Sequence, residues 1–362
     1  MPRNDVLIIG AGIIGSWLAL RLAKEKLAVT VVERGQPGEE ASWAAAGMLA
    51  PTSEHVHAPG EAELAAASAA LYPAWVQELE ERTNRSVAYR CEGTLLVAFD
   101  STEAAPLDSL PGEALTPEQA CRLEPPLSER LVAARFLPGD HQVDNRRLFQ
   151  TLLAAATAAG VCFLTGTSVE KLLVESGRCL GVRTAAGATL TAGGVVNAAG
   201  CWARQLGEVG ARLTPTRPIR GQVVSLCCEP SLLRHVVRSA RAYLVPRNGG
   251  RLLLGSTMED VGYDKSLTPA GLQRILAGAL EIAPALAERP FGEAWAGLRP
   301  DSPDHLPMLG ATDIENYFVA TGHFRNGILL APITAQLLAQ VILGRRPALS
   351  LEPFSPLRFA QK

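Results

Sequence analysis

The chain has 362 residues, of which 48% are hydrophobic and 19% are charged, and its formal net charge is −2. This length favours two domains, and the composition is that of a soluble globular enzyme, which excludes a disordered or fibrous protein. The small net charge provides no overall field that would attract nucleic acid or an anionic membrane.

The cysteines and histidines do not form a recognisable metal or redox motif. The close cysteine pair, Cys227 and Cys228, is adjacent, and the six histidines lack the HxxxH and HExxH spacings. These patterns suit neither a CxxC redox site nor zinc. We therefore expect no metal site, and seven reduced, mostly buried cysteines in a cytoplasmic protein.

A largely apolar run over residues 6–22 follows Arg3 and has some features of a signal peptide or membrane anchor. Asp5 immediately precedes the run, and three glycines interrupt it. The run is also shorter than the roughly 20 residues that a spanning helix needs. We therefore interpret it as part of the fold, and expect no membrane span.

The predicted elements begin with a βαβ unit. Residues 6–9 form a buried strand, residues 13–24 have helical periodicity, and residues 28–32 form a second strand that ends at Glu33. Further helices are predicted over residues 65–83, over 146–159 with Asp144 as the cap, and over 328–343. Further strands are predicted over residues 161–164, 194–197, 222–227, 242–245, 251–255 and 317–320, and a hairpin is predicted within residues 171–190. The strands between residues 221 and 257 are expected to form an antiparallel sheet.

Three glycines, Gly10, Gly12 and Gly15, stand between the first strand and the first helix. This GxGxxG spacing permits a tight turn and close approach of the backbone to a pyrophosphate, which the helix N-terminus then stabilises. Glu33 ends the next strand, where a carboxylate accepts hydrogen bonds from ribose hydroxyls and disfavours the 2′-phosphate of NADP. The pattern predicts a dinucleotide site, and by itself leaves FAD and NAD open.

A second small-residue turn favours FAD. Residues 194–200 (GVVNAAG) form a strand and turn followed by Cys201 and Trp202, a pattern that resembles the second dinucleotide contact of amine-oxidising flavoproteins. An NAD-dependent dehydrogenase has no need of it, and remains an alternative that predicts a colourless protein.

Three longer strings are more specific. Residues 44–51 (AAAGMLAP), 295–300 (WAGLRP) and 322–332 (GHFRNGILLAP) resemble the glycine oxidases of thiamine biosynthesis, within the wider family of D-amino acid and sarcosine oxidases. The resemblance covers nearly the whole chain and is strongest in the first 50 and last 70 residues. It implies a Rossmann-like α/β FAD-binding domain with an antiparallel crossover, and an α+β substrate domain built on an antiparallel sheet. The expected FAD-binding domain comprises residues 1–83, 142–215 and 292–362, and the expected substrate-binding domain comprises residues 84–141 and 216–291.

The resemblance also assigns roles to side chains around the substrate. It implies that Arg299 clamps the substrate carboxylate with its planar fork, assisted by the Tyr243 hydroxyl. Arg325 would lie near the same site, and Met258 would line the small pocket around the substrate Cα. From the residues alone, a surface position is an equally good interpretation of each arginine, and a single methionine more often fills the core.

The expected cofactor contacts come from both ends of the chain. Residues 323–329 are expected to run beside the flavin, with their amides stabilising negative charge on the reduced ring. The expected contacts are Gly10, Gly12, Ile13, Ile14, Gly15, Glu33, Arg34, Ala41, Ser42, Ala45, Ala46, Gly47, Met48, Val169, Gly200, Trp202, His323, Phe324, Arg325, Asn326, Gly327, Ile328 and Leu329.

Three positions depart from the family patterns. Sarcosine oxidases tether the flavin through a cysteine near the carboxylate arginine, but no cysteine follows Cys228, so we expect non-covalent FAD. Leu253 stands where those enzymes have a lysine that assists the reaction with dioxygen. Arg241 replaces the histidine that glycine oxidases have two residues before the tyrosine.

The activity implied is FAD-dependent oxidation of glycine and other small primary or secondary amines, such as sarcosine, by dioxygen. The products would be glyoxylate, ammonia and hydrogen peroxide, in support of thiazole synthesis. The main alternative is a D-amino acid or sarcosine-type oxidase or dehydrogenase with another electron acceptor. Members of the family often form homo-oligomers, but no sequence feature here marks an interface.

A third alternative is a non-catalytic flavin-binding or tRNA-associated module. Residues 212–251 contain eight arginines and a single acid, Glu229. Their spacing is irregular and few aromatic residues lie among them, which disfavours a nucleic-acid surface. We expect a solvated face with one anion-binding pocket.

Overall fold

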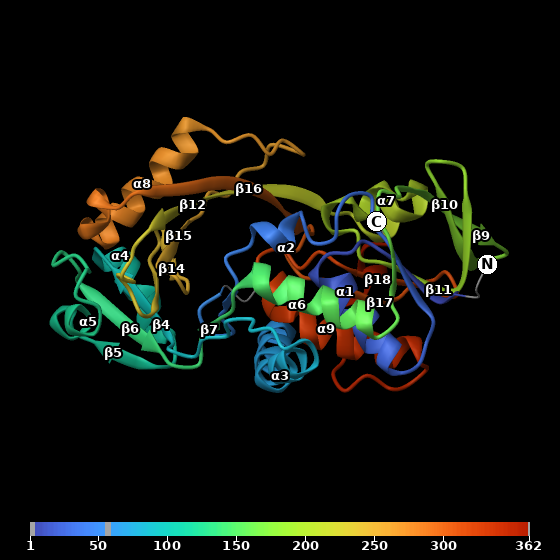
Figure 1. The fold of residues 1–362 in the computed structure, drawn as a ribbon, viewed down its shortest axis with the longest axis horizontal. Coiled ribbons are helices and arrows are strands. Elements are labelled where there is room, and N and C mark those ends of the chain that lie inside the picture. The colour runs from blue at the N-terminus through green and yellow to red at the C-terminus, as the bar shows by residue number, and fades with distance from the viewer. Residues whose placement is uncertain (1–3, 55–58, 361–362) are drawn as a thin grey trace.

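The structure is a computed structural model that describes residues 4–54 and 59–360. Within these residues the strands form two large sheets and one small pair, β3 (Met48–Leu49) with β7 (His141–Gln142). The two large sheets define two lobes, which lie side by side along the long axis of the molecule (Figure 1).

The first sheet has the strand order β17-β18-β11-β1-β2-β8. Five of these strands are parallel, namely β1 (Asn4–Ile9), β2 (Val29–Val32), β8 (Cys162–Leu164), β11 (Thr189–Asn197) and β18 (Tyr317–Thr321), and β17 (Met308–Ala311) runs antiparallel at the edge. β9 (Val169–Glu175) and β10 (Arg178–Thr184) form the predicted hairpin, and β10 pairs with β11.

The register brings the carboxyl ends of the central strands to one edge. Ile9 at the end of β1 pairs with Val32 of β2 on one side and with Asn197 of β11 on the other. Gly10, Glu33 and the turn after Asn197 therefore emerge next to one another, as the carboxyl edge of a doubly wound sheet requires for ligand binding.

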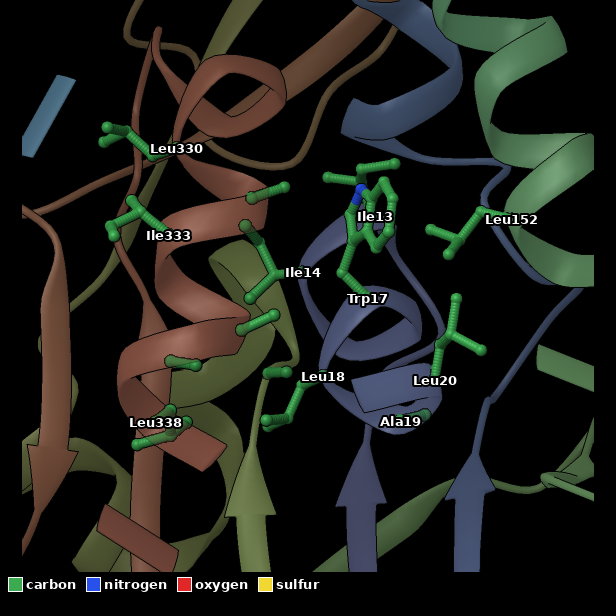
Figure 2. Packing of buried hydrophobic residues seen from close by; sticks show 14 of the residues in the cluster. Ile13, Ile14, Trp17, Leu18, Ala19, Leu20, Leu152, Leu330, Ile333 and Leu338 are labelled. Atoms are coloured by element: carbon green, nitrogen blue, oxygen red, sulfur yellow. The ribbon is translucent and has the colours of Figure 1, made fainter. Parts of the chain in front are cut away.

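Four helices share the core on one side of this sheet: α1 (Ile13–Lys24), α3 (Pro59–Thr83), α6 (Asn145–Ala158) and α9 (Gly327–Ile342). α1 and α9 contact the strands, and α3 packs against α6 and α9. Figure 2 shows α1 between α9 and α6, with Leu18 toward Leu338 and Leu20 toward Leu152. Because α1 packs against two helices and the sheet, its apolar residues are buried nearly all round. This explains why the run over residues 6–22 is so apolar without spanning a membrane.

The second sheet has the order β16-β12-β15-β14-β13-β4-β6-β5. Its strands are β4 (Thr94–Ala98), β5 (Glu113–Leu115), β6 (Ala133–Leu137), β12 (Arg217–Cys227), β13 (Val236–Arg238), β14 (Tyr243–Pro246), β15 (Arg251–Gly255) and β16 (Phe291–Asp301). All neighbours are antiparallel except β13 and β4. α8 (Pro269–Ile282) and α5 (Pro117–Leu123) contribute to the core beside this sheet.

The remaining helices are short: α2 (Ala41–Ala44), α4 (Ser101–Ala104) and α7 (Gly207–Leu213). Single 3₁₀ turns lie at Ala105–Ser109, Gly200–Gln205, Pro284–Glu288, Glu352–Phe354 and Pro356–Phe359. No helix within residues 4–54 and 59–360 is long and apolar enough to cross a membrane.

The α/β fold class with a mixed sheet and an antiparallel second sheet is confirmed. Asp144 caps α6 as predicted, and accepts hydrogen bonds from the amides of Arg146 and Arg147. The expected domain boundary at residue 292 falls within β16 (Phe291–Asp301) and stays a prediction. This strand pairs with β12 from Asp301 to Phe291, and the two strands run from the lobe of α8 toward the lobe of α7 (Figure 1).

Candidate active site

A cavity of about 380 Å³ extends from the carboxyl edge of the first sheet to the second sheet. The β1–α1 turn, the α2–β3 segment and the start of α9 line one part of it, while β14 and β16 contribute Tyr243 and Arg299. It therefore brings together segments from both ends and the middle of the chain.

Most of the expected site residues lie on this cavity. Those that line it are Gly10, Gly12, Ile13, Ile14, Glu33, Arg34, Ala41, Ser42, Ala45, Ala46, Gly47, Met48, Val169, Gly200, Trp202, Tyr243, Arg299, His323, Phe324, Arg325, Asn326, Gly327 and Ile328. Gly15, Met258 and Leu329 do not belong to the lining. Gly15 instead packs α1 on its strand, and Leu329 is in the core of the first lobe.

The glycine turn closes too tightly for larger residues. Gly10 has a φ of +103°, and a Cβ on it would lie 2.5 Å from the carbonyl oxygen of Ala198. A Cβ on Gly15 would lie 2.1 Å from the carbonyl oxygen of Gly10. The amide of Ile13, in the first turn of α1, donates to the Ser42 hydroxyl at 2.8 Å. This end of the cavity therefore offers a helix N-terminus and a hydroxyl to an anionic group.

Glu33 is fixed at the end of β2 by two backbone amides. One carboxylate oxygen accepts from the amide of Ala11 at 2.9 Å, and the other accepts from the amide of Gly35 at 2.9 Å. Each oxygen retains capacity to accept a second hydrogen bond. This geometry fits the ribose contact expected for a carboxylate at this position.

A cluster of aromatic and charged side chains lies beside Glu33. The Arg34 guanidinium carbon lies 3.5 Å from the centre of a Trp202 ring, and the Trp202 ring packs against Tyr263. Glu40 forms ion pairs with Arg34 at 2.7 Å and with Lys265 at 3.1 Å. Tyr263 and Lys265 were not predicted, because they come from the distant segment between β15 and α8 and their sequence has no distinguishing motif.

Arg299 lies at the other end of the cavity. Its guanidinium donates to the Ser256 hydroxyl at 2.7 Å and to the Thr257 carbonyl at 3.2 Å. Among the described residues no carboxylate forms an ion pair with it, and desolvation lowers its pKa. A partly buried cation with neutral partners favours an anionic ligand.

Two glycines make room for the Arg299 and Tyr243 side chains. A Cβ on Gly221 would lie 2.3 Å from Nη1 of Arg299, and a Cβ on Gly255 would lie 2.2 Å from the Tyr243 hydroxyl. Burial also raises the pKa of Tyr243, so the phenol stays protonated and can donate a hydrogen bond. The two glycines were not predicted, since their role depends on contacts between separate strands.

Arg325 also lines the cavity, but it already pairs with a carboxylate. Its Nε lies 2.9 Å from Glu54, and the other oxygen of Glu54 lies 2.8 Å from Nη2 of Arg238. Glu54 was not predicted as a site residue. Because Arg325 already pairs with Glu54, while no described carboxylate pairs with Arg299, Arg299 is the better partner for a carboxylate that enters the cavity.

The structure corrects the expectation for Met258. Its side chain is 58% exposed, and it does not line the pocket. Thr257 points inward and is buried, with its hydroxyl bonded to the Gln222 amide, and Glu259 pairs with Arg220. Because neighbouring side chains in an extended segment alternate in direction, Met258 faces solvent.

Arg241 and Leu253, the two departures near the substrate side chains, lie outside the cavity lining. Arg241 forms ion pairs with Asp100, Glu103 and Glu281. Leu253 is buried in an apolar cluster with Val245 and Trp295. Neither residue contributes a polar group to the cavity.

Arg247, which follows β14, is buried beneath the cavity wall. Its guanidinium donates to the Ala46 carbonyl and to the Gln142 side chain, and a Cβ on Gly47 would approach its Nη2 within 3.0 Å. Desolvation lowers its pKa to about 10. Arg247 thus ties the strand that contains Tyr243 to the segment that lines the cofactor end.

The other arginines between residues 212 and 251 do not form a free basic surface. Five of them form ion pairs: Arg212 with Asp313, Arg217 with Asp260 and Asp301, Arg220 with Glu259 and Asp264, Arg238 with Glu54, and Arg251 with Glu293. The paired arrangement does not resemble an electrostatic footprint for nucleic acid. Across the described ranges, no three His, Cys, Asp or Glu side chains gather as metal ligands.

His323 is a cavity residue whose burial predicts a pH effect. It is 3% exposed, its Nε2 lies 3.0 Å from the Thr334 hydroxyl, and desolvation lowers its pKa to about 3. An unfolded histidine titrates near 6.5, so the unfolded chain binds the extra proton first as the pH falls. His323 therefore contributes stability above about pH 6.5, and this contribution is lost progressively toward pH 3.

We expect the free energy of unfolding of the wild type to fall by roughly 3 kcal/mol more than that of His323→Gln between pH 7 and pH 4. Denaturant titrations at both pH values measure this difference. The carboxylates titrate in both proteins, so their effects cancel. Parallel pH profiles for the two proteins would contradict the assignment.

Comparison with known proteins identifies the family. A family model described as FAD dependent oxidoreductase (DAO) matches residues 5–341. The glycine oxidase of Geobacillus kaustophilus is 36% identical, covering 99% of this chain and 98% of its own, and that of Pseudomonas aeruginosa is 34% identical, covering 97% and 98%. The bifunctional protein ThiO/ThiG of Synechocystis is 38% identical over 98% of this chain, which spans about half of that relative's length.

The solved structures agree with these sequence matches. The crystal structure of the Geobacillus kaustophilus glycine oxidase superposes with a TM-score of 0.94 at 35% identity, covering 98% of this chain and 99% of that one. The FAD-dependent oxidoreductase fold thus extends over nearly the whole chain. By sequence and by structure, the chain belongs to the DAO family of FAD-dependent oxidoreductases.

Proposed function

We propose that this protein oxidises glycine, and other small primary or secondary amines such as sarcosine, with dioxygen. The observation that supports this most directly is the Arg299 guanidinium, which faces the cofactor cavity without a carboxylate partner among the described residues. The glycine oxidases of Geobacillus kaustophilus and Pseudomonas aeruginosa, which are 36% and 34% identical, support the choice of substrate.

The described residues fit FAD. Gly10 and the start of α1 suit its pyrophosphate, Glu33 suits a ribose, and the cavity continues from there to Arg299. When bound, FAD supplies the two-electron acceptor for the amine and returns the electrons to dioxygen. We propose that it is bound non-covalently, because burial of the cavity-lining Cys201 raises its pKa to about 12 and keeps the thiol protonated.

In the proposed mechanism, this chain's residues act mainly by binding and orientation. Arg299 holds the substrate carboxylate in a bidentate pair, and the Tyr243 hydroxyl donates a further hydrogen bond to it. The amine then enters uncharged, and its Cα–H bond faces the cofactor end of the cavity. No side-chain base is required, since the hydrogen leaves with its electron pair.

The overall reaction consumes one glycine, one dioxygen and one water, and forms one glyoxylate, one ammonia and one hydrogen peroxide. We propose that it serves thiamine thiazole synthesis, as the names of the 37–38% identical bifunctional ThiO/ThiG relatives suggest. We also propose a cytoplasmic protein without nucleic-acid partners. All seven cysteines lie in the described part and are free, as expected for a reducing compartment, although only three of them, Cys179, Cys201 and Cys228, are buried.

A product balance tests this proposal. Purified protein is incubated with glycine, sarcosine and D-alanine in parallel while oxygen uptake, peroxide and the oxo acid are measured. We expect glycine and sarcosine to give one peroxide and one glyoxylate for each oxygen consumed. Turnover of D-alanine without turnover of glycine would overturn the assignment of substrate.

A second candidate is the same oxidation with an electron acceptor other than dioxygen. Its support is the similarity to the crystal structure of an L-proline dehydrogenase, at 25% identity and a TM-score of 0.86. Reduction of an artificial dye by glycine under anaerobic conditions, with negligible oxygen uptake in air, would favour this candidate.

A further inference from the structure

A proline lies inside α9, one turn after the residues that line the cofactor cavity. In a regular helix the amide at position 332 would donate to the carbonyl of Ile328, but Pro332 has no N–H. Ile328 and Pro332 are both buried, so water cannot readily replace the missing donor. An unpaired buried carbonyl of this kind is unfavourable and rare.

Two hydroxyls from α3 donate to carbonyls of this turn, one of them the carbonyl that lacks the Pro332 donor. The Tyr72 hydroxyl, 1% exposed, donates a short hydrogen bond to the Ile328 carbonyl. The Ser68 hydroxyl donates to the Leu329 carbonyl at 2.5 Å. Because positions 68 and 72 are four residues apart, both hydroxyls lie on the same face of α3.

A third contact from the same helix reaches the N-cap of α9. The Asn326 side-chain amide donates to the carboxylate of Glu61 at 3.2 Å, and Glu61 is 3% exposed. Glu61, Ser68 and Tyr72 thus hold the N-cap and first turn of α9 from one side. Because these contacts come from three successive parts of α3, they restrict both the sliding of that turn along the α9 axis and its rotation about that axis.

The turn that is held in this way belongs to the cofactor site. Asn326, Gly327 and Ile328 all line the cavity, and α9 begins at Gly327. Its first amides and the positive end of its dipole therefore lie at the cavity, where they stabilise negative charge within about one helical turn. A small displacement of this turn would weaken that stabilisation.

We propose that Tyr72 is a positioning residue for the flavin, which replaces the donor that Pro332 lacks and so fixes the first turn of α9 against the cofactor. Ser68 supports the same position. The inference uses the FAD site of the family and does not depend on which amine is oxidised. Its failure is therefore distinguishable from failure of the proposed substrate.

The midpoint potential of the bound flavin, measured without substrate on holoenzyme of equal flavin content, tests the role of Tyr72. We expect Tyr72→Phe to lower the two-electron potential by about 30 mV, equivalent to a tenfold shift toward the oxidised form. Ser68→Ala should lower it in the same direction, and provides the test if Tyr72→Phe does not fold.

Tyr89→Phe is the matched control. The Tyr89 ring stacks on that of Tyr72, but its hydroxyl contacts Nδ1 of His141 at 2.7 Å instead of α9. The control therefore removes a hydroxyl from the same aromatic stack without freeing a carbonyl of α9. Its flavin potential should equal that of the wild type.

Pro332→Ala in the Tyr72→Phe background provides a rescue. The new amide at position 332 can donate to Ile328 in the ordinary helical pattern, so at least half of the lost potential should return. An unchanged potential in both Tyr72→Phe and Ser68→Ala would overturn the proposal, as would an equal fall in Tyr89→Phe. Failure of Pro332→Ala to restore any of the potential would overturn the proposed replacement of a missing donor.

Discussion

We expect Arg299→Met to lower kcat/KM for glycine by a factor of roughly thirty to several thousand while the purified protein retains its FAD. The reason is the loss of a desolvated, charge-assisted pair with the substrate carboxylate, for which truncation costs about 2–5 kcal/mol. FAD remains bound because Gly10, Glu33 and the start of α1 are untouched. Steady-state kinetics with glycine, together with the flavin absorbance, measure both effects.

Two further variants sharpen this prediction. Arg299→Lys should recover only part of the activity, because an ammonium cannot form the bidentate pair. Arg241→Met is the matched control: this arginine is bound by Asp100, Glu103 and Glu281 outside the cavity lining, and its loss should leave glycine kinetics unchanged. Wild-type kinetics in Arg299→Met would remove Arg299 from the substrate site.

The second large effect is expected at the other end of the cavity. In Gly15→Ala the new Cβ would lie 2.1 Å from the Gly10 carbonyl oxygen, so the phosphate-binding turn must open. Overpacking of this kind costs about 1–3 kcal/mol. We expect FAD affinity to fall roughly ten- to a hundredfold, measured by titrating the apoprotein with FAD.

Gly139→Ala controls for the substitution itself. Among the described residues no heavy atom lies within 4 Å of a Cβ built on Gly139, so FAD affinity should not change. A Gly15→Ala protein that binds FAD as tightly as the wild type would show that the turn tolerates the added methyl group, against the steric account.

The cofactor end of the site was predictable because its signals are local. Gly10, Gly12, Gly15 and Glu33 lie within one βαβ unit, where strand and helix periodicities are unambiguous, and the structure places the turn and the acid side by side. The cap of α6 by Asp144 and the hairpin before β11 follow from equally local patterns.

The substrate end was less predictable because it depends on contacts between distant segments. β4, β6 and β16 were not predicted as strands, since their pairing partners are far away in the sequence. The space for Arg299 comes from Gly221 on the neighbouring strand. The prediction for Met258 was wrong because neighbouring side chains in an extended segment point in opposite directions, and here Thr257 faces inward.

The reduction of the flavin by glycine in the absence of dioxygen tests the central claim most directly. Anaerobic addition of glycine to the yellow holoenzyme should bleach the flavin absorbance with saturation, and admission of air should restore the colour with formation of one peroxide per flavin. Arg299→Met should require far more glycine for the same bleaching. Wild-type holoenzyme that stays oxidised with saturating glycine would contradict the account.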